Sequence, residues 1–326
     1  MKRILTLSLA FAIFLIPSLH PYASGKSSAI ERYLVVGFDD AAQNTDVVAV
    51  VSYQHGSNRL SLLQIPRDTY YEFGGVQCKL NQLFPYVLAG RDSKAAREEA
   101  MRVLSSAVSS FLGVPINSFV GVSIADFASM IDAIGGVPMF LDREITYRDE
   151  ETGELVRLPS GERLLSGKEA SAFVRYRIGY SGGDLARIDA QKVFISALLR
   201  KFGSGLSIST LLKILSQLRS GTVTDIPISL AIRCGLRFLR SYSKTDIRYL
   251  TLPGEHCMHG GISYYVANRA CCETAVSEQL CFSESRPTFD PESKLLMATD
   301  TNMTEIYRRE SVPYHVYTDA ELRLDS

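Results

Sequence analysis

The sequence predicts an α/β fold, a three-layer α/β/α sandwich with a mixed, partly antiparallel central sheet. Two observations lead to this prediction. Three short apolar segments follow one another between residues 33 and 65 with polar turns between them, which is typical of antiparallel strands. Further apolar strand-like segments then alternate with helical patterns, which is typical of a sheet covered by helices.

Composition and charge are those of an ordinary globular protein. The 326 residues are 46% hydrophobic and 21% charged, with 35 basic residues against 35 acidic ones. This balance gives no indication of nucleic-acid binding.

The N-terminal segment has the layout of a secretory signal. Lys2 and Arg3 precede a mostly apolar run over residues 4–16, and small residues follow at 23–25. About 13 apolar residues are short for a membrane span, so residues 1–25 are interpreted as a signal peptide or a membrane anchor, with cleavage favoured. Export across the cytoplasmic membrane follows.

The first three predicted strands, over residues 33–38, 47–53 and 60–65, place charged side chains at one edge of the sheet. The first strand ends, the second begins and the third ends at the same edge. Carboxylates beside arginine suit Mg²⁺ that bridges to phosphate, whereas the alternative interpretation makes the aspartates turn and cap residues. The residues expected at this rim are Asp39, Asp40, Asp46, Arg67 and Asp68.

The remaining elements follow in order along the chain. Lys79, a phosphate contact or a simple surface charge, precedes an apolar stretch. Glycines end the amphipathic helix over 93–112 and the helix over 126–134, and polar residues mark a surface hairpin over 143–159. Strands are expected at 118–124, 137–141 and 246–252, and later helices at 190–202, 207–219, 227–240 and 271–281.

A polar, arginine-rich segment over residues 173–191 interrupts the apolar pattern. Ser166 and Glu169 have capping-box spacing and are expected to start a helix that runs to about residue 174. If the chain is extended just after it, alternation points Arg175 and Arg177 to the same side. Two paired guanidiniums at one place suit a phosphate group.

A second helix is expected to begin near Asp184. On it, Asp184, Arg187 and Gln191 are spaced i, i+3, i+7 and so share one face. The alternative interpretation is a solvated helix face held by salt bridges, because structural ion pairs also gather charged residues.

Cysteine usage fits an exported protein. Six cysteines are present, and four of them lie between residues 257 and 281. We therefore expect at least one disulfide within that cluster.

Over residues 33–282 the chain resembles the LytR-CpsA-Psr (LCP) family, which attaches teichoic acids and capsular polysaccharides to peptidoglycan in Gram-positive bacteria. The resemblance rests on four motifs in the same order along the chain. They are Gly37-Phe38-Asp39 with Asp46 opening the next strand, Ile65-Pro66-Arg67-Asp68-Thr69, Asp132-Ala133-Ile134-Gly135-Gly136-Val137, and the segment from Arg175 to Gln191. One departure is Asn44, which stands where many members carry arginine.

The resemblance implies an LCP catalytic domain over residues 26–283, and residues 284–326 are interpreted as a loosely attached polar tail. It further implies that Asp39 and Asp46 hold Mg²⁺ and that Asp184 and Gln191 complete the site. The implied pyrophosphate ligands are Arg67, Lys79, Arg175, Arg177 and Arg187.

The implied reaction is Mg²⁺-dependent phosphotransfer at the extracellular face of the cytoplasmic membrane or in the cell wall. A polyprenyl-pyrophosphate-linked glycan is the donor, and a muramic acid hydroxyl of peptidoglycan is the acceptor. Two alternatives stay open: a secreted polyprenyl pyrophosphatase, and a non-catalytic protein that binds an anionic glycan or lipid.

A polyprenyl donor also requires an apolar channel beside the phosphates, because its hydrocarbon chain has to leave water. We expect that channel to draw on apolar residues of the flanking helices. They are Leu83, Phe84, Val87, Leu88, Phe127, Met130, Ile131, Phe194, Ile195 and Leu198.

Overall fold

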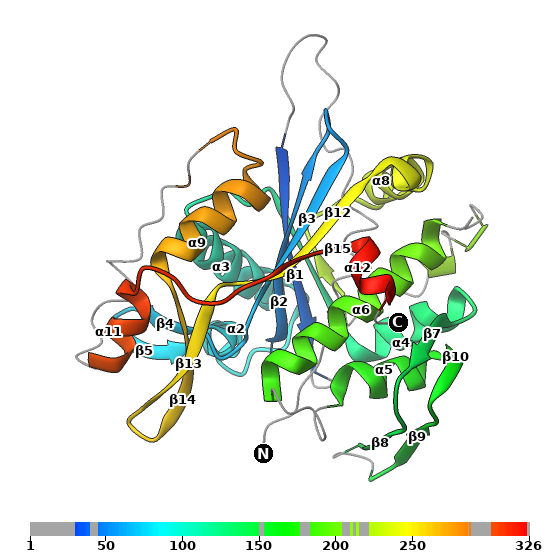
Figure 1. Ribbon diagram of the computed structural model, residues 1–326, viewed down its shortest axis with the longest axis horizontal. Helices are drawn as coiled ribbons and strands as arrows, with labels where there is room; N and C mark the ends of the chain where they lie inside the picture. The colour runs from blue at the N-terminus through cyan, green and yellow to red at the C-terminus, as the bar shows by residue number, and fades with distance from the viewer. Residues whose placement is uncertain are drawn as a thin grey trace.

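A seven-stranded mixed sheet forms the centre of the protein (Figure 1). The computed structural model describes residues 30–39, 45–149, 153–176, 183–203, 209–210, 213–214, 222–285, 287 and 301–324. The strand order is β11-β6-β1-β2-β3-β12-β15. The bounds of these strands are β1 Ile30–Phe38, β2 Thr45–Gln54, β3 Arg59–Ile65, β6 Ser118–Ser123, β11 Val223–Thr224, β12 Asp246–Thr251 and β15 Val316–Thr318.

The predicted antiparallel unit is confirmed. β1 pairs with β2 and β2 with β3, both antiparallel, whereas β6 joins β1 and β12 joins β3 in parallel. The sheet is therefore mixed, as predicted. Thr45 lies opposite Phe38, and Val48 lies opposite Ile65, so the three chain segments around Asp39, Asp46 and Arg67 meet at one edge.

Side chains alternate between two buried cores, one on each face of the sheet. Along β1, Tyr33 and Val35 belong to one core, whereas Leu34 and Val36 belong to the other. Figure 1 shows helices on both sides of the sheet, which confirms the three layers. One side carries α4 Ile124–Ala133, α5 Gly167–Arg175, α6 Gly183–Gly203, α8 Ile228–Ser241 and α12 Asp319–Leu324, and the other carries α2 Leu83–Leu88, α3 Lys94–Leu112, α9 Arg269–Ala275 and α11 Thr301–Arg308.

Two-stranded hairpins surround the sheet. In Figure 1, the β8–β9 and β13–β14 hairpins both project below the sheet, past the edge at which β1 ends and β2 begins. The predicted hairpin over 143–159 is confirmed as β8–β9. The paired strands are β4 Tyr70–Phe73 with β5 Val76–Lys79, β7 Val137–Leu141 with β10 Gly161–Leu165, β8 Ile145–Arg148 with β9 Leu155–Leu158, and β13 Gly254–His259 with β14 Ile262–Ala267.

Three short helical segments complete the described elements: η1 Leu80–Gln82, η2 Tyr242–Lys244 and the π-helical η3 Val276–Leu280. The helix predicted over 207–219 and the N-terminal segment over 1–25 fall mainly or wholly outside the described residues. No helix in the part of the chain that the structure describes is long and apolar enough to span a membrane.

The prediction of a loosely attached tail from residue 284 is wrong for residues 301–324. β15 extends the central sheet by pairing antiparallel with β12. Met303 and Tyr307 of α11 are each 2% exposed, and Leu322 of α12 is also 2% exposed. The segment is polar on average, so its composition did not reveal that these few apolar residues are buried. The prediction from composition alone therefore missed how the segment packs against the rest of the protein.

The predicted disulfide is also wrong. Cys257, Cys271, Cys272 and Cys281 are all buried, and none of these four is in a disulfide bond. The Cys272 thiol donates to the carbonyl of Pro253 at 3.2 Å, whereas Arg32 Nη2 lies 3.6 Å from Cys281 Sγ. The cysteines are close in sequence, but their thiols therefore lie in different parts of the core.

Candidate active site

A buried ion pair between Asp46 and Arg67 lies at the centre of the predicted rim. Arg67 Nη1 donates to Asp46 Oδ1 at 2.7 Å, and the two residues are 7% and 4% exposed. The pair joins the start of β2 to the segment that follows β3, as the strand pattern predicted. The second carboxylate oxygen, Asp46 Oδ2, is buried and has no hydrogen-bond partner among the described residues.

Burial raises the pKa of Asp46 to about 6, against the opposing influence of the Arg67 and Arg187 charges. Asp39 adds to the increase, which places its carboxylate close enough to repel that of Asp46. Asp39 is itself 5% exposed. Two neighbouring carboxylates, together with the buried Asp46 Oδ2 that has no hydrogen-bond partner among the described residues, fit a Mg²⁺ ion. Such an ion commonly takes one or two protein carboxylates.

Among the described residues, no group of three or more histidine, cysteine, aspartate or glutamate side chains could hold a metal ion. At phosphate sites Mg²⁺ usually takes one or two carboxylates and keeps several waters beside the phosphate oxygens.

Lys79 is held beside Arg67 by the backbone. The Leu80 amide donates to the Thr69 carbonyl at 2.8 Å, and the Asn81 amide donates to the Arg67 carbonyl at 3.2 Å. The Lys79 ammonium lies 3.0 Å from Asp68 Oδ1 and 5.7 Å from the centre of the Tyr264 ring. Lys79 is only 7% exposed, so it is not a simple surface charge.

The face of α6 that carries Arg187 and Gln191 packs against the same part of the sheet. Arg187 is 2% exposed, and its charge reaches Asp46. Gln64 Nε2, on β3, donates to Gln191 Oε1, and Gln191 Nε2 donates to the Val174 carbonyl at 3.3 Å. The two glutamines therefore connect β3, the end of α5 and α6.

Arg175 is the last residue of α5, so the premise of an extended chain from Arg175 is wrong. The predicted capping box at Ser166 and Glu169 is present and starts the helix, but the helix runs one residue further than predicted. Arg175 Nη1 donates to Asp149 Oδ2 at 2.9 Å, and its guanidinium lies 5.6 Å from the Tyr147 ring centre. The Arg175 side chain is only 9% exposed.

Some predicted site residues cannot be placed. Arg177, Asp40 and Asn44 lie outside the described residues. Asp184 falls within α6, as expected, but its side chain is not among those described. The structure thus brings together Asp39, Asp46, Arg67, Lys79, Arg187 and Gln191, and connects Arg175 to them through Val174.

Two residues of this network were missed in the sequence. Gln64 is a polar residue in a buried apolar strand close to Arg67, and that position could have marked it. Asp149 gave no such signal, because its contact with Arg175 spans 26 residues and depends on how the β8–β9 hairpin folds back.

The residues predicted to line one apolar channel do not lie together. Leu83, Phe84, Val87 and Leu88 belong to the core on the α3 side of the sheet. The other six belong to the core on the α6 side, where the Phe127 and Phe194 rings are 6.0 Å apart. Only this second set is on the same side of the sheet as Arg187 and Gln191.

Comparison with known proteins gives a match to one family. The sequence profile of the LytR_cpsA_psr family matches residues 24–279. The chain is 26% identical over 238 residues to the polyisoprenyl-teichoic acid–peptidoglycan teichoic acid transferase TagU of Bacillus mycoides, covering 71% of this chain and 72% of that protein. It is 27% identical to the corresponding transferase TagV of Bacillus subtilis, covering 60% of this chain but only 50% of that protein.

Solved structures share the fold. Protein gbs0355 of Streptococcus agalactiae superposes with a TM-score of 0.66 at 20% identity, covering 79% of this chain and 90% of that one. B. subtilis TagV superposes with a TM-score of 0.62 at 22% identity, covering 78% and 99%. TagT bound to LIIa-WTA superposes with a TM-score of 0.60 at 21% identity, covering 79% and 96%.

Proposed function

The chain belongs to the LytR-CpsA-Psr family, and from that premise we propose that it transfers a glycan phosphate from a polyprenyl-pyrophosphate-linked glycopolymer to a hydroxyl of peptidoglycan. The relatives TagU and TagV are transferases of teichoic acid to peptidoglycan. The reaction would take place outside the cytoplasm, where both the donor headgroup and the acceptor are accessible. The glycopolymer would be of the teichoic acid or capsular polysaccharide type.

The observation that carries the proposal is the set of buried cations beside the buried carboxylate of Asp46. Arg67, Lys79 and Arg187 are each at most 7% exposed. Arg67 and Lys79 are paired with Asp46 and Asp68, but three cations gathered at one place still create a positive potential that attracts an anionic ligand. Guanidiniums bind phosphate oxygens two at a time, and the pyrophosphate of the donor offers several.

Phosphoryl transfer requires positive charge and alignment more than covalent help from the protein. The acceptor oxygen forms a bond to the glycan-linked phosphorus, and the bond from that phosphorus to the bridging oxygen breaks. Polyprenyl phosphate leaves with the bridging oxygen, and the hydroxyl proton is released. Arg67 and Arg187 would hold the phosphate oxygens against the charge that develops, and Lys79 would bind the leaving phosphate as a point charge.

Asp39 and Asp46 are the residues that would hold Mg²⁺, which supplies positive charge to phosphate oxygens when it is bound. The two glutamines would keep α6 in register with β3. Gln191 is hydrogen-bonded both to Gln64 and to the carbonyl of Val174, the residue before Arg175. A shift of α6 would therefore move Arg187 and Arg175 together.

The test is reconstitution with purified protein, a polyprenyl-pyrophosphate-linked glycan, Mg²⁺ and peptidoglycan. The expected product is glycan joined covalently to peptidoglycan, with release of polyprenyl phosphate. Release of polyprenyl phosphate at the same rate without peptidoglycan, and no joined glycan, would indicate the pyrophosphatase alternative.

A further inference from the structure

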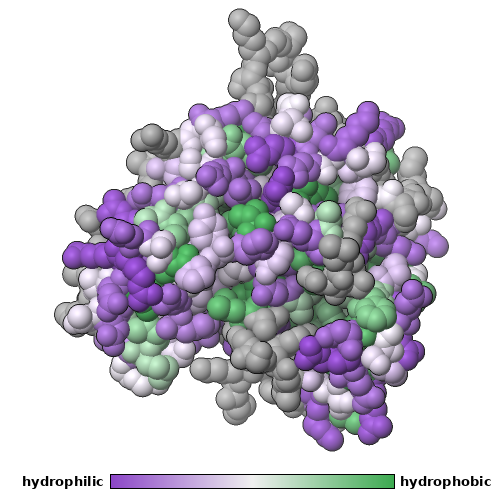
Figure 2. Space-filling view, viewed as in Figure 1, coloured by the Kyte–Doolittle hydropathy of each residue, from purple (hydrophilic) through white to green (hydrophobic). Residues whose placement is uncertain are grey.

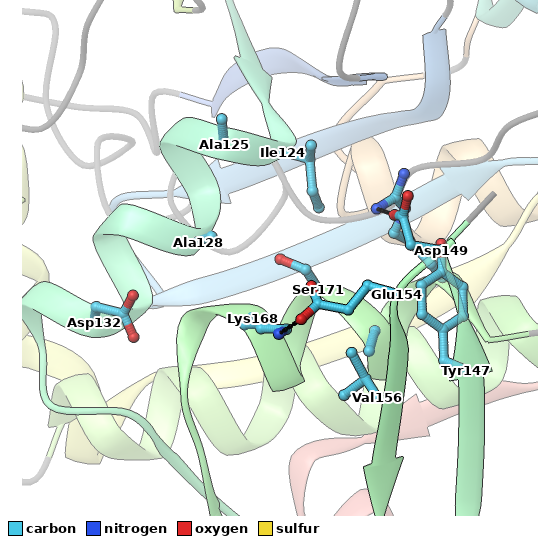
Figure 3. A pocket seen from close by; sticks show the side chains of 12 residues that line it. Ile124, Ala125, Ala128, Asp132, Tyr147, Asp149, Glu154, Val156, Lys168 and Ser171 are labelled. Atoms are coloured by element: carbon cyan, nitrogen blue, oxygen red, sulfur yellow. Dashed lines mark hydrogen bonds and ion pairs between the residues drawn. The ribbon is translucent and has the colours of Figure 1, made fainter. Parts of the chain in front are cut away.

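A pocket of about 480 Å³ lies next to Arg175, between α4, α5 and the β8–β9 hairpin. Figure 3 shows Ala125, Ala128 and Asp132 along α4, facing Lys168 and Ser171 of α5. Tyr147, Asp149 and Glu154 of the hairpin segment form the third wall. The volume is within the range of small-molecule sites, roughly 300–1,000 Å³.

The close contact between α4 and α5 forms the base of the pocket. Gly167 is the first residue of α5, and a Cβ there would collide with the Ala128 carbonyl. Its amide donates to Asp132 Oδ1 at 2.7 Å, which fixes the start of α5 against α4. Two walls of the pocket are therefore formed by helices that pack closely against each other.

The lining indicates a neutral, hydroxyl-rich ligand. Three carboxylates, Asp132, Asp149 and Glu154, face two cations, Lys168 and Arg175. A hydroxyl group can donate to the carboxylates and accept from the cations, whereas a phosphate can only accept. Figure 2 shows the surface of the β8–β9 hairpin, at the lower right, as strongly hydrophilic, and small alanines with the Tyr147 ring give the pocket an apolar part.

Arg175 connects this pocket to the proposed phosphate site. It lines the pocket through its contact with Asp149, and the preceding residue, Val174, bonds Gln191 of the phosphate site. A sugar in the pocket would therefore lie beside the donor pyrophosphate. A donor phosphate that engages Arg175 would compete with Asp149 for the guanidinium and leave that carboxylate to accept a hydrogen bond from a hydroxyl.

We propose that this pocket is the acceptor subsite, which binds a sugar ring of the peptidoglycan glycan strand and directs one hydroxyl toward the phosphate held by Arg175. This inference rests on the proposed function for the identity of the acceptor. Asp149 positions the hydroxyl by accepting its hydrogen bond, and the Lys168–Glu154 pair closes the outer side.

The test compares two phenylalanine variants on α4. Ala125 is exposed and lines the pocket, so Ala125→Phe fills it without disturbing the core. Ser129 is also exposed, lies one turn further along the same helix, and does not line the pocket, so Ser129→Phe is the matched control. The transfer assay uses soluble, uncross-linked glycan strands as the acceptor, and KM is measured for donor and acceptor separately.

Ala125→Phe is expected to raise the acceptor KM at least roughly ten-fold and to leave the donor KM within about two-fold, since only the acceptor's polar contacts are lost. Ser129→Phe should leave both values within about two-fold. An unchanged acceptor KM in Ala125→Phe overturns the proposal. An increase in the donor KM instead also overturns it, because the pocket would then hold the donor's own sugar.

Glu154→Gln provides a second variant if Ala125→Phe does not fold. It keeps the shape of a side chain that is 55% exposed and removes its charge. The acceptor KM should rise several-fold, and no change overturns the assignment. If the wild-type protein does not transfer at all, calorimetry with the same glycan strands decides the matter: binding weakened by Ala125→Phe supports the subsite, and absence of binding overturns it.

Discussion

The buried carboxylate of Asp46 leads to a prediction about stability and pH. Its pKa increases from an ordinary value of 3.8 to about 6 in the folded, metal-free protein. At roughly 1.4 kcal/mol per pH unit, this corresponds to about 3 kcal/mol. Because the folded-state pKa is raised, this stability is fully present below pH 3.8 and is lost as the pH rises through about 6.

About 2 kcal/mol of that loss should fall between pH 4.5 and 8. Asp46→Asn removes the titrating group, while the amide oxygen of the new side chain can still accept the hydrogen bond from Arg67, so the stability of the variant carries no contribution from this titration. The difference in unfolding free energy between wild type and Asp46→Asn should therefore shift by about 2 kcal/mol in favour of the variant over this range.

The assay is urea unfolding in chelator at several pH values, with the two proteins compared at each. Comparison cancels the other titrating groups, which the proteins share. Parallel curves would mean that Asp46 titrates normally, and the burial argument at this site would be refuted.

The remaining predictions concern the metal, the arginines, the helix contact and the cysteines. Mg²⁺ should raise the melting temperature more at pH 8 than at pH 5, because protons compete for Asp46 below its pKa of about 6; equal shifts at both pH values would remove Asp46 from the metal site. Arg175→Ala should abolish transfer and also lower stability by about 1–3 kcal/mol, since it leaves the Asp149 carboxylate without its ion pair; unaltered stability in urea unfolding would contradict the partly buried pair. Gly167→Ala should lower stability by about 1–3 kcal/mol because of its collision with Ala128, whereas Lys168→Ala next to it, at an exposed side chain, should change stability by less than about 0.5 kcal/mol. Reducing agent should leave the melting temperature unchanged, and peptide mapping under native conditions should recover Cys257, Cys271, Cys272 and Cys281 as thiols. A disulfide-linked peptide from this set of cysteines would contradict this prediction.

The central part of the site could be predicted because strand connectivity determines it. An antiparallel turn returns the chain to the same edge of the sheet, so Asp46 and Arg67 had to meet once their strands were recognised. Helical spacing likewise placed Arg187 and Gln191 on one face of α6.

Other features depended on tertiary contacts that local patterns do not encode. A helix longer by one residue changed the environment of Arg175 from an extended strand to a helix end that reaches Asp149. β15 is far from β12 in the sequence, and its pairing with β12 is a tertiary contact. The polar composition of the segment around β15 did not indicate that it would join the sheet. The cysteines were close in sequence, but α9 and the β13–β14 hairpin direct their side chains to different neighbours.

The fate of the glycan-linked phosphorus tests the central claim most directly. The donor is prepared with a radioactive label on that phosphorus alone and is incubated with the protein, Mg²⁺ and peptidoglycan. Phosphotransfer at the Arg67 and Arg187 site predicts that the label becomes covalently attached to peptidoglycan, that the polyprenyl phosphate released is unlabelled, and that Arg67→Met loses both products. Label that appears only as free glycan phosphate, or attachment of glycan without the label, would contradict the account.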